Sequence, residues 1–469
     1  MSETLIPFLA QTLPSETVKS ACGLTLDIGR QRMTAENFED LVAIMEQKGV
    51  LEANAAMRRG DIVNQSEGRA ALHTALRDPR IGAPYHDQVS QALERICRAA
   101  EAIRSGRHCG CRGDVFTDVI NVGIGGSEMG PRTVYHALRQ PAQRIRMHFL
   151  ASADGVAFDR VTAMLNPFKT LVIISSKSFK TRETAVNAAA IDQWLLEAGI
   201  SGKDRSKHIL VVSANPDAAA EMNLPSDNLF PIWDWVGGRF SVWSAIGLPD
   251  AITLGSEVFR NLLAGAHAMD EHVCTMPIRD NIPALLAMTA YWNATHCGIT
   301  SHCVLPYDER LRVLVLWLQQ LEMESLGKNH TPQGDFVEGL TGQSVWGGHG
   351  NESQHSFYQW LREGTARTSI DLLWCEKPGH KHADLHRVLI ANAKAQAQAL
   401  VTRDSDEFYN AVSTICINEL TPATLGALLA MYEHKTTMLG TLYGINPFDQ
   451  PGVEYGKRLS RRAEGDVAV

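Results

Sequence analysis

The stretch Asp118–Arg132 constrains the fold of this chain more than any other, because a strand, a glycine turn and a helix start follow one another directly. Val119–Val122 is short and apolar, which is typical of a buried strand, and Ser127 is a good helix N-cap. Glycines at 123, 125 and 126 permit a tight turn between them. Backbone N–H groups and the helix dipole then point at one spot, so the stretch predicts a site for phosphate or another anion.

The same turn does not match the two common nucleotide-binding fingerprints. Its Gly-x-Gly-Gly-Ser spacing lacks the Lys-Ser/Thr ending of a P-loop and does not complete the glycine pattern of dinucleotide-binding folds. A strand-to-helix turn whose glycines serve packing alone therefore stays open as an alternative.

Residues from about 115 to 250 alternate short apolar runs with helical segments. This alternation predicts an α/β fold with a parallel sheet covered by helices. Ligands of such sheets bind beyond the carboxyl ends of the strands. The expected strands are 119–122, 148–150, 171–175 and 209–212, and a helix is expected at 184–196.

A second polar turn follows the expected strand at 171–175. The run Ser175–Thr181 contains three serines, a threonine and two lysines, and a helix follows it. Hydroxyls and N–H groups at a helix start suit a phosphate monoester, although a serine-rich turn with a capped helix is the simpler interpretation. Two such turns at one sheet edge favour phosphate binding more than either does alone.

A second α/β unit is predicted from about residue 281. A strand at 302–305, a long helix at 310–326, a strand at 368–376 and a helix at 386–400 repeat the first pattern, and a helix at 423–442 follows. Residues 1–105 are predicted to be helices and loops, and the polar stretch Met57–Asp78 to be an exposed helix with a turn. We expect four segments: 1–105, 106–265, 266–440 and 441–469.

The charge balance limits the possible partners. The net charge of −8 argues against nucleic acid as the main partner. The chain shows neither an N-terminal secretion signal nor an apolar run long enough to span a membrane, so no membrane association is expected. Its odd number of scattered cysteines, nine, predicts reduced thiols and a cytoplasmic location.

Two clusters of metal-ligand residues are present, but neither has the spacing of a common metal site. His108, Cys109 and Cys111 form one cluster, and three histidines at 380, 382 and 386 form the other. No second ligand pair at zinc spacing follows the first cluster, so we predict no metal and no cofactor.

Candidate catalytic residues occur in three further segments. Glu322 and Glu324 lie at the end of the apolar helix at 310–326, where partial burial suits a carboxylate for general base catalysis, and the spacing does not decide between them. Arg239 follows two glycines and is either an anion ligand or a surface charge. His349 and His355 lie in a glycine-rich polar turn and are either acid–base catalysts or surface residues.

These motifs together resemble the phosphoglucose isomerase (glucose-6-phosphate isomerase) family with two sugar-isomerase (SIS) domains. The resemblance is collinear from about Met57 to Arg458 and implies two parallel-sheet αβα sandwiches with helical terminal segments. The matching stretches are Met57–Arg77, Gly123–Pro131, Ser176–Thr184, Gly237–Gly247, Met323–Lys328, Gln354–Gln359 and Asn446–Lys457.

The resemblance implies a role for each candidate in the isomerisation of glucose 6-phosphate and fructose 6-phosphate. Glu324, not Glu322, would move the proton between C1 and C2, and Arg239 would stabilise the enediolate. His355 and Lys457 would open the sugar ring, His355 acting in the neighbouring subunit of a homodimer. The implied substrate-binding residues are Gly126, Ser127, Ser176, Lys177, Ser178, Thr181, Gln320 and Gln450.

Several residues depart from the family pattern near the expected sugar site. Leu326 replaces the usual Asn, Ser178 and Lys180 replace Thr, and Glu352 and Ser353 precede the ring-opening histidine. Two alternatives follow: an isomerase of another hexose phosphate, or a non-catalytic sugar-phosphate sensor. All four implied catalytic residues are present, which disfavours the sensor.

Overall fold

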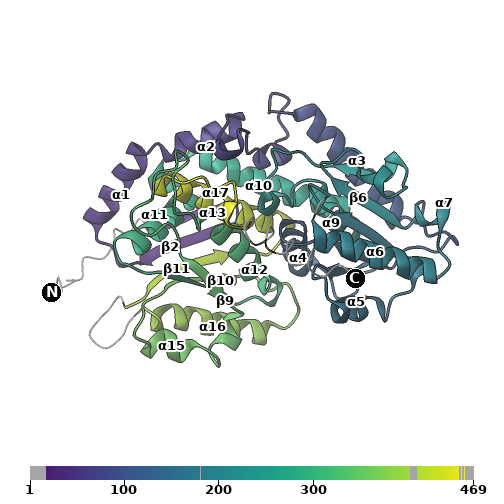
Figure 1. Ribbon diagram of the computed structural model, residues 1–469. Helices are drawn as coiled ribbons and strands as arrows, with labels where there is room; N and C mark the ends of the chain where they lie inside the picture. The colour runs from purple at the N-terminus through teal and green to yellow at the C-terminus, as the bar shows by residue number, and fades with distance from the viewer. Residues whose placement is uncertain (1–16, 180, 402–408, 454–455, 457–458, 460–469) are drawn as a thin grey trace.

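The computed structural model describes residues 17–179, 181–401, 409–453, 456 and 459, and it contains two β-sheets with helices on both faces of each (Figure 1). This arrangement confirms the predicted α/β class with parallel sheets. None of the described helices is both long and apolar enough to cross a membrane.

The first sheet is entirely parallel and has the order β4-β3-β5-β6-β7. Its central strands are buried on both faces, which explains their nearly continuous apolar sequences. All four strands predicted in this region are confirmed. The strands are β3 (Asp118–Val122), β4 (Arg146–Leu150), β5 (Thr170–Ser175), β6 (Ile209–Ser213) and β7 (Leu229–Pro231).

Helices cover both faces of the first sheet, because alternate side chains of each strand point to opposite layers. One layer packs with Ile120 and Val172, and the other with Val119 and Leu171. The first layer contains α5 (Gly155–Thr162), α6 (Arg182–Glu197) and α8 (Ala218–Glu221). The second contains α3 (His86–Arg104), α4 (Gly126–Leu138) and α9 (Leu248–Leu254).

The second sheet has the order β1-β2-β11-β10-β8-β9, and its last four strands are parallel. Those four repeat the order of β6-β5-β3-β4 in the first sheet. The strands are β1 (Val18–Ala21), β2 (Leu24–Arg30), β8 (Ser301–Pro306), β9 (Ser344–Gly347), β10 (Ser369–Cys375) and β11 (Ala411–Ile417).

A central helical layer lies above the second sheet in Figure 1, and a further pair of helices lies below it. The central layer holds α10 (Ser256–Thr275), α11 (Ile282–Thr295), α12 (Leu314–Leu318) and α17 (Pro422–Tyr443). The pair below is α15 (Tyr358–Glu363) and α16 (Ala383–Ala399). Further α-helices among the described residues are α1 (Ala35–Gln47), α2 (Val50–Arg59), α7 (Gly202–Arg205), α13 (Glu324–Leu326) and α14 (Gly350–Ser353).

The N-terminal segment is not purely helical, contrary to our prediction. β1 and β2 form a hairpin, and β2 pairs antiparallel with β11, so the second sheet is mixed. The hairpin turn is Cys22–Gly23, and both residues have positive φ angles (53° and 77°), as a tight two-residue hairpin turn requires. Cysteine is not a usual residue for such a turn, and the sequence signal was therefore weak.

The polar stretch Met57–Asp78 is not an exposed helix either. α2 ends at Arg59, and a buried 3₁₀ helix, η3 (His73–Arg77), follows after an irregular segment. The Arg77 side chain is fully buried and pairs with Asp270 and Glu433. The buried end of the stretch therefore contributes to an interior ion-pair network, whereas most residues at 61–68 are exposed.

The predicted long helix at 310–326 is divided into several pieces. A 3₁₀ turn, η9 (Glu309–Leu311), precedes α12, and a π-helical turn, Gln319–Met323, separates α12 from α13. The expected segment boundaries stay predictions, although residues 265 and 266 lie inside α10, and 440 and 441 inside α17.

Candidate functional site

A cavity of ≈ 640 Å³ opens at the carboxyl edge of the first sheet. The chain leaves β3 towards β4 on one side and later returns to β5 on the other side, so the crevice between β3 and β5 is a topological switch point. Residues after both strands line the cavity, among them Gly126 and Ser176. The two polar turns selected from the sequence therefore meet at one site.

The first turn brings the start of α4 against a second backbone segment. Gly125 is the N-cap residue, with a φ of 62°, and the helix begins at Gly126. A Cβ on Gly126 would lie 2.1 Å from the carbonyl oxygen of Gly238, so only glycine fits there. Ser127 lies in the first helical turn, which corrects its predicted role as the N-cap.

The second turn places hydroxyl groups at the start of α6. Ser176, Ser178 and Thr181 all line the cavity, and Thr181 is the N-cap residue of α6. The Ser176 and Thr181 hydroxyl oxygens are 3.5 Å apart. Two helix N-termini and a group of hydroxyls thus face one end of the cavity, an arrangement suited to an anion.

Lys177 lines the same end, but its ammonium group also holds a neighbouring loop. The Nζ atom donates to the carbonyl oxygens of Asp234 and Val236, at 2.8 Å each. Burial lowers the pKa of Lys177 to about 8, and the positive charge of Arg69 acts in the same direction. Lys177 therefore supplies a positive charge whose protonation changes just above neutral pH.

Gln320 in the π turn and Glu324, the first residue of α13, both line the cavity, whereas Glu322 in the π turn does not. Glu322 is buried and accepts hydrogen bonds from Lys435 of α17 at 2.8 and 3.1 Å. The Glu324 side chain is 25% exposed. The structure therefore separates the two glutamates that the sequence spacing left equivalent: Glu322 belongs to the interior, and Glu324 faces the cavity.

Arg239 is a buried cation beside Glu324. Its guanidinium donates to the Ser325 hydroxyl at 2.6 Å and to Gln450 Oε1 at 3.0 Å, and also to backbone carbonyls of the segment 447–449. The Arg239 Nη1 and Glu324 Oε2 atoms are 3.7 Å apart. Burial lowers the pKa of Arg239, while the nearby Glu324 carboxylate acts in the opposite direction.

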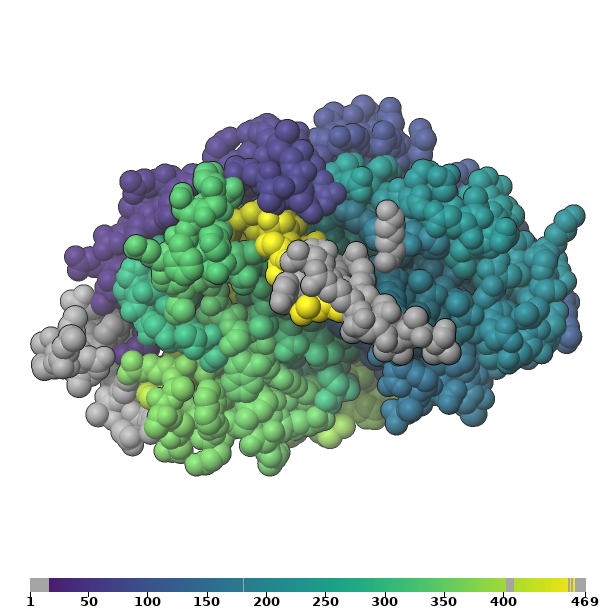
Figure 2. All heavy atoms as spheres, in the orientation of Figure 1, coloured from purple at the N-terminus to yellow at the C-terminus, as the bar shows by residue number. Residues whose placement is uncertain are grey.

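The C-terminal segment completes the wall around Arg239, with Phe448, Gln450 and Val453 lining the cavity. In Figure 2, yellow residues of this segment lie between the teal first-sheet region and the green second-sheet region. Lys328 joins the segment to α13, because its Nζ donates to the carbonyl oxygens of Ser325 and Asn446 at 2.6 and 3.0 Å. The end of the cavity around Arg239 is therefore built from three distant parts of the chain.

The sequence profile of the family described as phosphoglucose isomerase matches residues 27–468. The chain belongs to the phosphoglucose isomerase family. Glucose-6-phosphate isomerase from Burkholderia multivorans is 41% identical over 96% of this chain and 87% of its own length. The enzyme of the same name from Saccharophagus degradans is 40% identical over 94% and 85%, respectively.

Solved structures agree with this membership of the phosphoglucose isomerase family. A glucose-6-phosphate isomerase from Chlamydia trachomatis aligns with a TM-score of 0.85 and 29% identity, over 96% of this chain and 90% of that one. A Thermus thermophilus protein described as hypothetical aligns with a TM-score of 0.76 and 27% identity, over 94% and 99%.

The cavity of this phosphoglucose isomerase family chain gathers most of the candidate residues. His355 is exposed, lies just after α14 and does not line the cavity of its own chain. Lys457 lies outside the described residues, as does Lys180. The candidates that line the cavity are Gly126, Ser127, Ser176, Lys177, Ser178, Thr181, Arg239, Gln320, Glu324 and Gln450.

Four charged residues at the cavity were not predicted as site residues, and one of them, Glu183, lies in the first turn of α6. Glu67 and Arg69 come from the polar stretch after α2, and Asp234 comes from the loop that Lys177 holds. Arg69 donates to Glu67 through Nε at 3.0 Å, and its Nη1 lies 3.9 Å from Asp234 Oδ1. The unusual polarity of the stretch was the available signal, but it was interpreted as solvent exposure.

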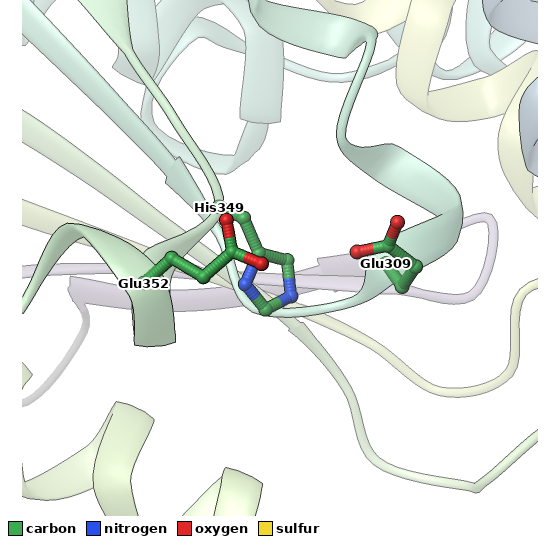
Figure 3. Close-up of side chains that lie close together, drawn as sticks. All are labelled: Glu309, His349 and Glu352. Carbon is green, nitrogen blue, oxygen red and sulfur yellow. The ribbon is translucent and has the colours of Figure 1, made fainter.

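Among the described residues, one group of side chains has the spacing of metal ligands, and it does not line the cavity. Figure 3 shows Glu309, His349 and Glu352 close together, and their ligand atoms lie within 4.8 Å of one another. Both carboxylates already accept hydrogen bonds from Arg312. The group is therefore an ion-pair cluster around an arginine. Within the described ranges, neither the cluster of His108, Cys109 and Cys111 nor the cluster of histidines at 380, 382 and 386 forms such a group.

Proposed function

We propose that the chain interconverts glucose 6-phosphate and fructose 6-phosphate through a cis-enediol(ate) intermediate. Membership of the phosphoglucose isomerase family supports this reaction. The single observation that carries the mechanism is the 3.7 Å approach of Arg239 and Glu324 in a cavity whose opposite end has two helix N-termini. A carboxylate beside a fixed cation suits proton transfer next to a developing oxyanion.

The phosphate group would bind at the helix N-termini. Hydroxyls of Ser127, Ser176, Ser178 and Thr181 and backbone N–H groups from Gly126 onward would contact its oxygens, and Lys177 would supply positive charge. Binding the phosphate away from C1 and C2 orients the sugar, so binding energy supports the chemical step.

Glu324 would act as the base that moves the proton. In the aldose-to-ketose direction it takes the C2 proton and returns it at C1, while the O2 hydroxyl proton is transferred to O1. Arg239 stabilises the negative charge on the enediolate oxygen, because a guanidinium stays charged at any working pH.

Gln320 and Gln450 would orient the sugar hydroxyls. Among the described residues, the side-chain oxygen of Gln320 is buried and has no hydrogen-bond partner. Buried polar atoms are almost always paired, so a bound sugar hydroxyl is a suitable donor for this atom.

Ring opening would use His355 and Lys457. Because His355 is exposed and outside its own chain's cavity, we assign it to the cavity of the neighbouring subunit in a homodimer. The proposal requires neither metal nor cofactor. It includes a role in glycolysis and gluconeogenesis and a cytoplasmic location, which the nine free cysteines support.

The positions of Leu326 and Glu352, two residues that depart from the family pattern, favour glucose 6-phosphate and fructose 6-phosphate over another hexose phosphate as substrates. Leu326 is buried in the main core, and Glu352 pairs with Arg312 on the surface. Neither lines the cavity of its own chain, so neither contacts the sugar expected there.

The test is a coupled assay of fructose 6-phosphate conversion to glucose 6-phosphate, with EDTA present, for the wild type and Glu324→Gln. We expect robust wild-type turnover and a loss of about 10³-fold in the variant, within the range for general base catalysis. The variant should still gain thermal stability from fructose 6-phosphate, because its phosphate site is intact. A wild type that binds this sugar without converting it contradicts the proposal.

A further inference from the structure

Helix α17 carries four consecutive polar side chains in the protein interior, Tyr432, Glu433, His434 and Lys435. Each is at most 1% exposed. Burying charged groups is costly unless each is paired, so a run of this kind implies specific partners. Tyr432 donates to Asp371 of β10, His434 bonds Asp270 of α10, Glu433 accepts from Arg77 and Trp243, and Lys435 donates to Glu322.

Lys435 binds the π turn on the side that faces away from the cavity. Its partner Glu322 lies in the middle of that turn, two residues after Gln320 and two before Glu324. Gln320 and Glu324 face the cavity, whereas Glu322 faces α17. A π turn is rare and often occurs at functional sites. Here the Lys435–Glu322 ion pair holds Glu322 against α17, so that Gln320 faces the cavity.

Glu433 holds the segment that carries Arg239. Its carboxylate accepts from the Trp243 indole Nε1 at 2.8 Å and from Arg77 at 2.7 Å. Trp243 lies four residues after Arg239 in the sequence. His73, in the same turn as Arg77, stacks on Phe240 with ring centroids 4.5 Å apart. Glu433 therefore contacts the segment that follows Arg239 directly at Trp243 and indirectly, through η3, at Phe240.

We propose that Glu433 and Lys435 are positioning residues that set the separation of Arg239 and Glu324 from one rigid helix. The inference rests on the proposed function, in which those two side chains perform the chemistry. Glu433 and Lys435 touch neither the cavity nor each other's partner. Their effect is transmitted through Trp243 and Glu322.

The test replaces the Lys435–Glu322 ion pair by two apolar residues. A buried pair exchanged for hydrophobic residues of similar volume often keeps its stability, whereas loss of one partner does not. In Glu322→Met/Lys435→Met we expect a Tm within a few degrees of the wild type. We expect kcat to fall about 10- to 100-fold, the cost of a small misplacement, and KM to stay within about twofold, because the phosphate contacts are unchanged.

Tyr432→Phe is the matched control. It removes a buried hydrogen bond from the same helix, but the partner Asp371 lies in β10 and does not line the cavity. It should lower Tm while leaving kcat unchanged. If the double variant does not fold, Glu322→Asp preserves both charges and shortens the reach to Lys435, and it should also lower kcat at constant KM.

A wild-type kcat in the folded double variant, or in Glu322→Asp, would overturn the inference. A crystal structure of the variant gives a readout that does not depend on activity. We expect its Arg239–Glu324 separation to exceed the 3.7 Å seen here, and an unchanged separation would also overturn it. Absent turnover in the wild type would contradict the proposed function alone, because the separation can still be measured.

Discussion

The two sheets contain the same kind of crevice, but only the first crevice forms the cavity. In both sheets four parallel strands have the same order, with switch points between β3 and β5 and between β8 and β10. After β3 the chain reads Gly-Ile-Gly-Gly-Ser, and the backbone of Gly126 meets that of Gly238. After β8 it reads Tyr-Asp-Glu-Arg, and Arg310 occupies the corresponding place.

Arg310 fills the second crevice with its own guanidinium. It donates to Asp308 at 2.7 and 2.8 Å, and a Cβ on Gly379 after β10 would lie 2.2 Å from its Nη1 atom. The first crevice thus offers N–H groups and hydroxyls to a ligand, whereas the second neutralises its own charge internally. The comparison shows that the loops at an α/β switch point, and not the strand order alone, determine which groups face the crevice.

The largest effect on activity is expected when a methyl group is introduced into the first crevice by substitution of Gly126. Gly126→Ala would force the start of α4 away from the turn that carries Arg239, because both contacting groups are backbone. A displacement of this size should lower kcat/KM for fructose 6-phosphate by about 10²-fold or more. Steady-state kinetics on the folded variant measures this loss.

Gly155→Ala is the control for that variant. Gly155 is the first residue of α5, which packs on the same sheet, just as Gly126 is the first residue of α4. A Cβ on Gly155 would meet no atom within 4 Å. Its kinetics should match the wild type. Equal losses in both variants would mean that the close approach at Gly126 is not what shapes the site.

An intermediate effect, on stability but not on activity, is expected in the second crevice. Asp308→Asn removes the carboxylate that pairs with Arg310 and should lower the free energy of unfolding by about 1–3 kcal/mol at neutral pH. Urea unfolding measures the change, and kcat and KM should be unaffected. A large kinetic defect would show that the second crevice takes part in the reaction.

The stability difference should depend on pH in a defined direction. Burial alone would raise the pKa of Asp308, but hydrogen bonds from Arg310 outweigh it and the pKa is lowered. A carboxyl with a lowered pKa stabilises the folded state above its unfolded pKa of about 3.9, and this contribution is lost as the pH falls through its folded value. The difference in stability between the wild type and Asp308→Asn should therefore begin to decrease below about pH 4 and continue to decrease as the pH falls further.

The smallest effect is expected on KM above neutral pH, where the positive charge at the first crevice is lost and that at the second is kept. Lys177, with its pKa lowered to about 8, loses its proton as the pH rises, whereas Arg310 stays charged. KM for fructose 6-phosphate should therefore rise several-fold above about pH 8. In Lys177→Arg the rise should be absent, and a pH profile of KM identical in both proteins would contradict a role for this charge.

The fold was predictable where strands are buried on both faces. β3, β5 and β6 have nearly continuous apolar runs, and their positions and that of β4 were predicted to within two residues. The three-residue strand β7 was not predicted. The β1–β2 hairpin was missed because it lies at the sheet edge, where β2 alternates between buried and half-buried residues, and its turn residue Cys22 is unusual. One face of β2 is only half-buried, so packing constrains the residue types on its other face more strongly.

The candidate site was predictable from local motifs but not from their long-range partners. Ser176 and Gly126 could be assigned to one sheet edge because parallel strands share a direction. Nothing in the spacing distinguished Glu322 from Glu324, since the difference depends on Lys435 in a distant helix. Arg77 was judged exposed because its two carboxylate partners are far away in the sequence.

The pairing of β2 with β11 has a consequence for the synthesis of this protein. Leu26 of β2 pairs in register with Ile415 of β11. Because these strands are far apart in the sequence, the hairpin leaves the ribosome long before β11 is synthesised. At typical elongation rates of about 5–20 residues per second, the delay is roughly 20 to 80 seconds. During that interval the apolar face of β2 is without its neighbour, and the nascent chain exposes a strand edge that chaperones are suited to protect.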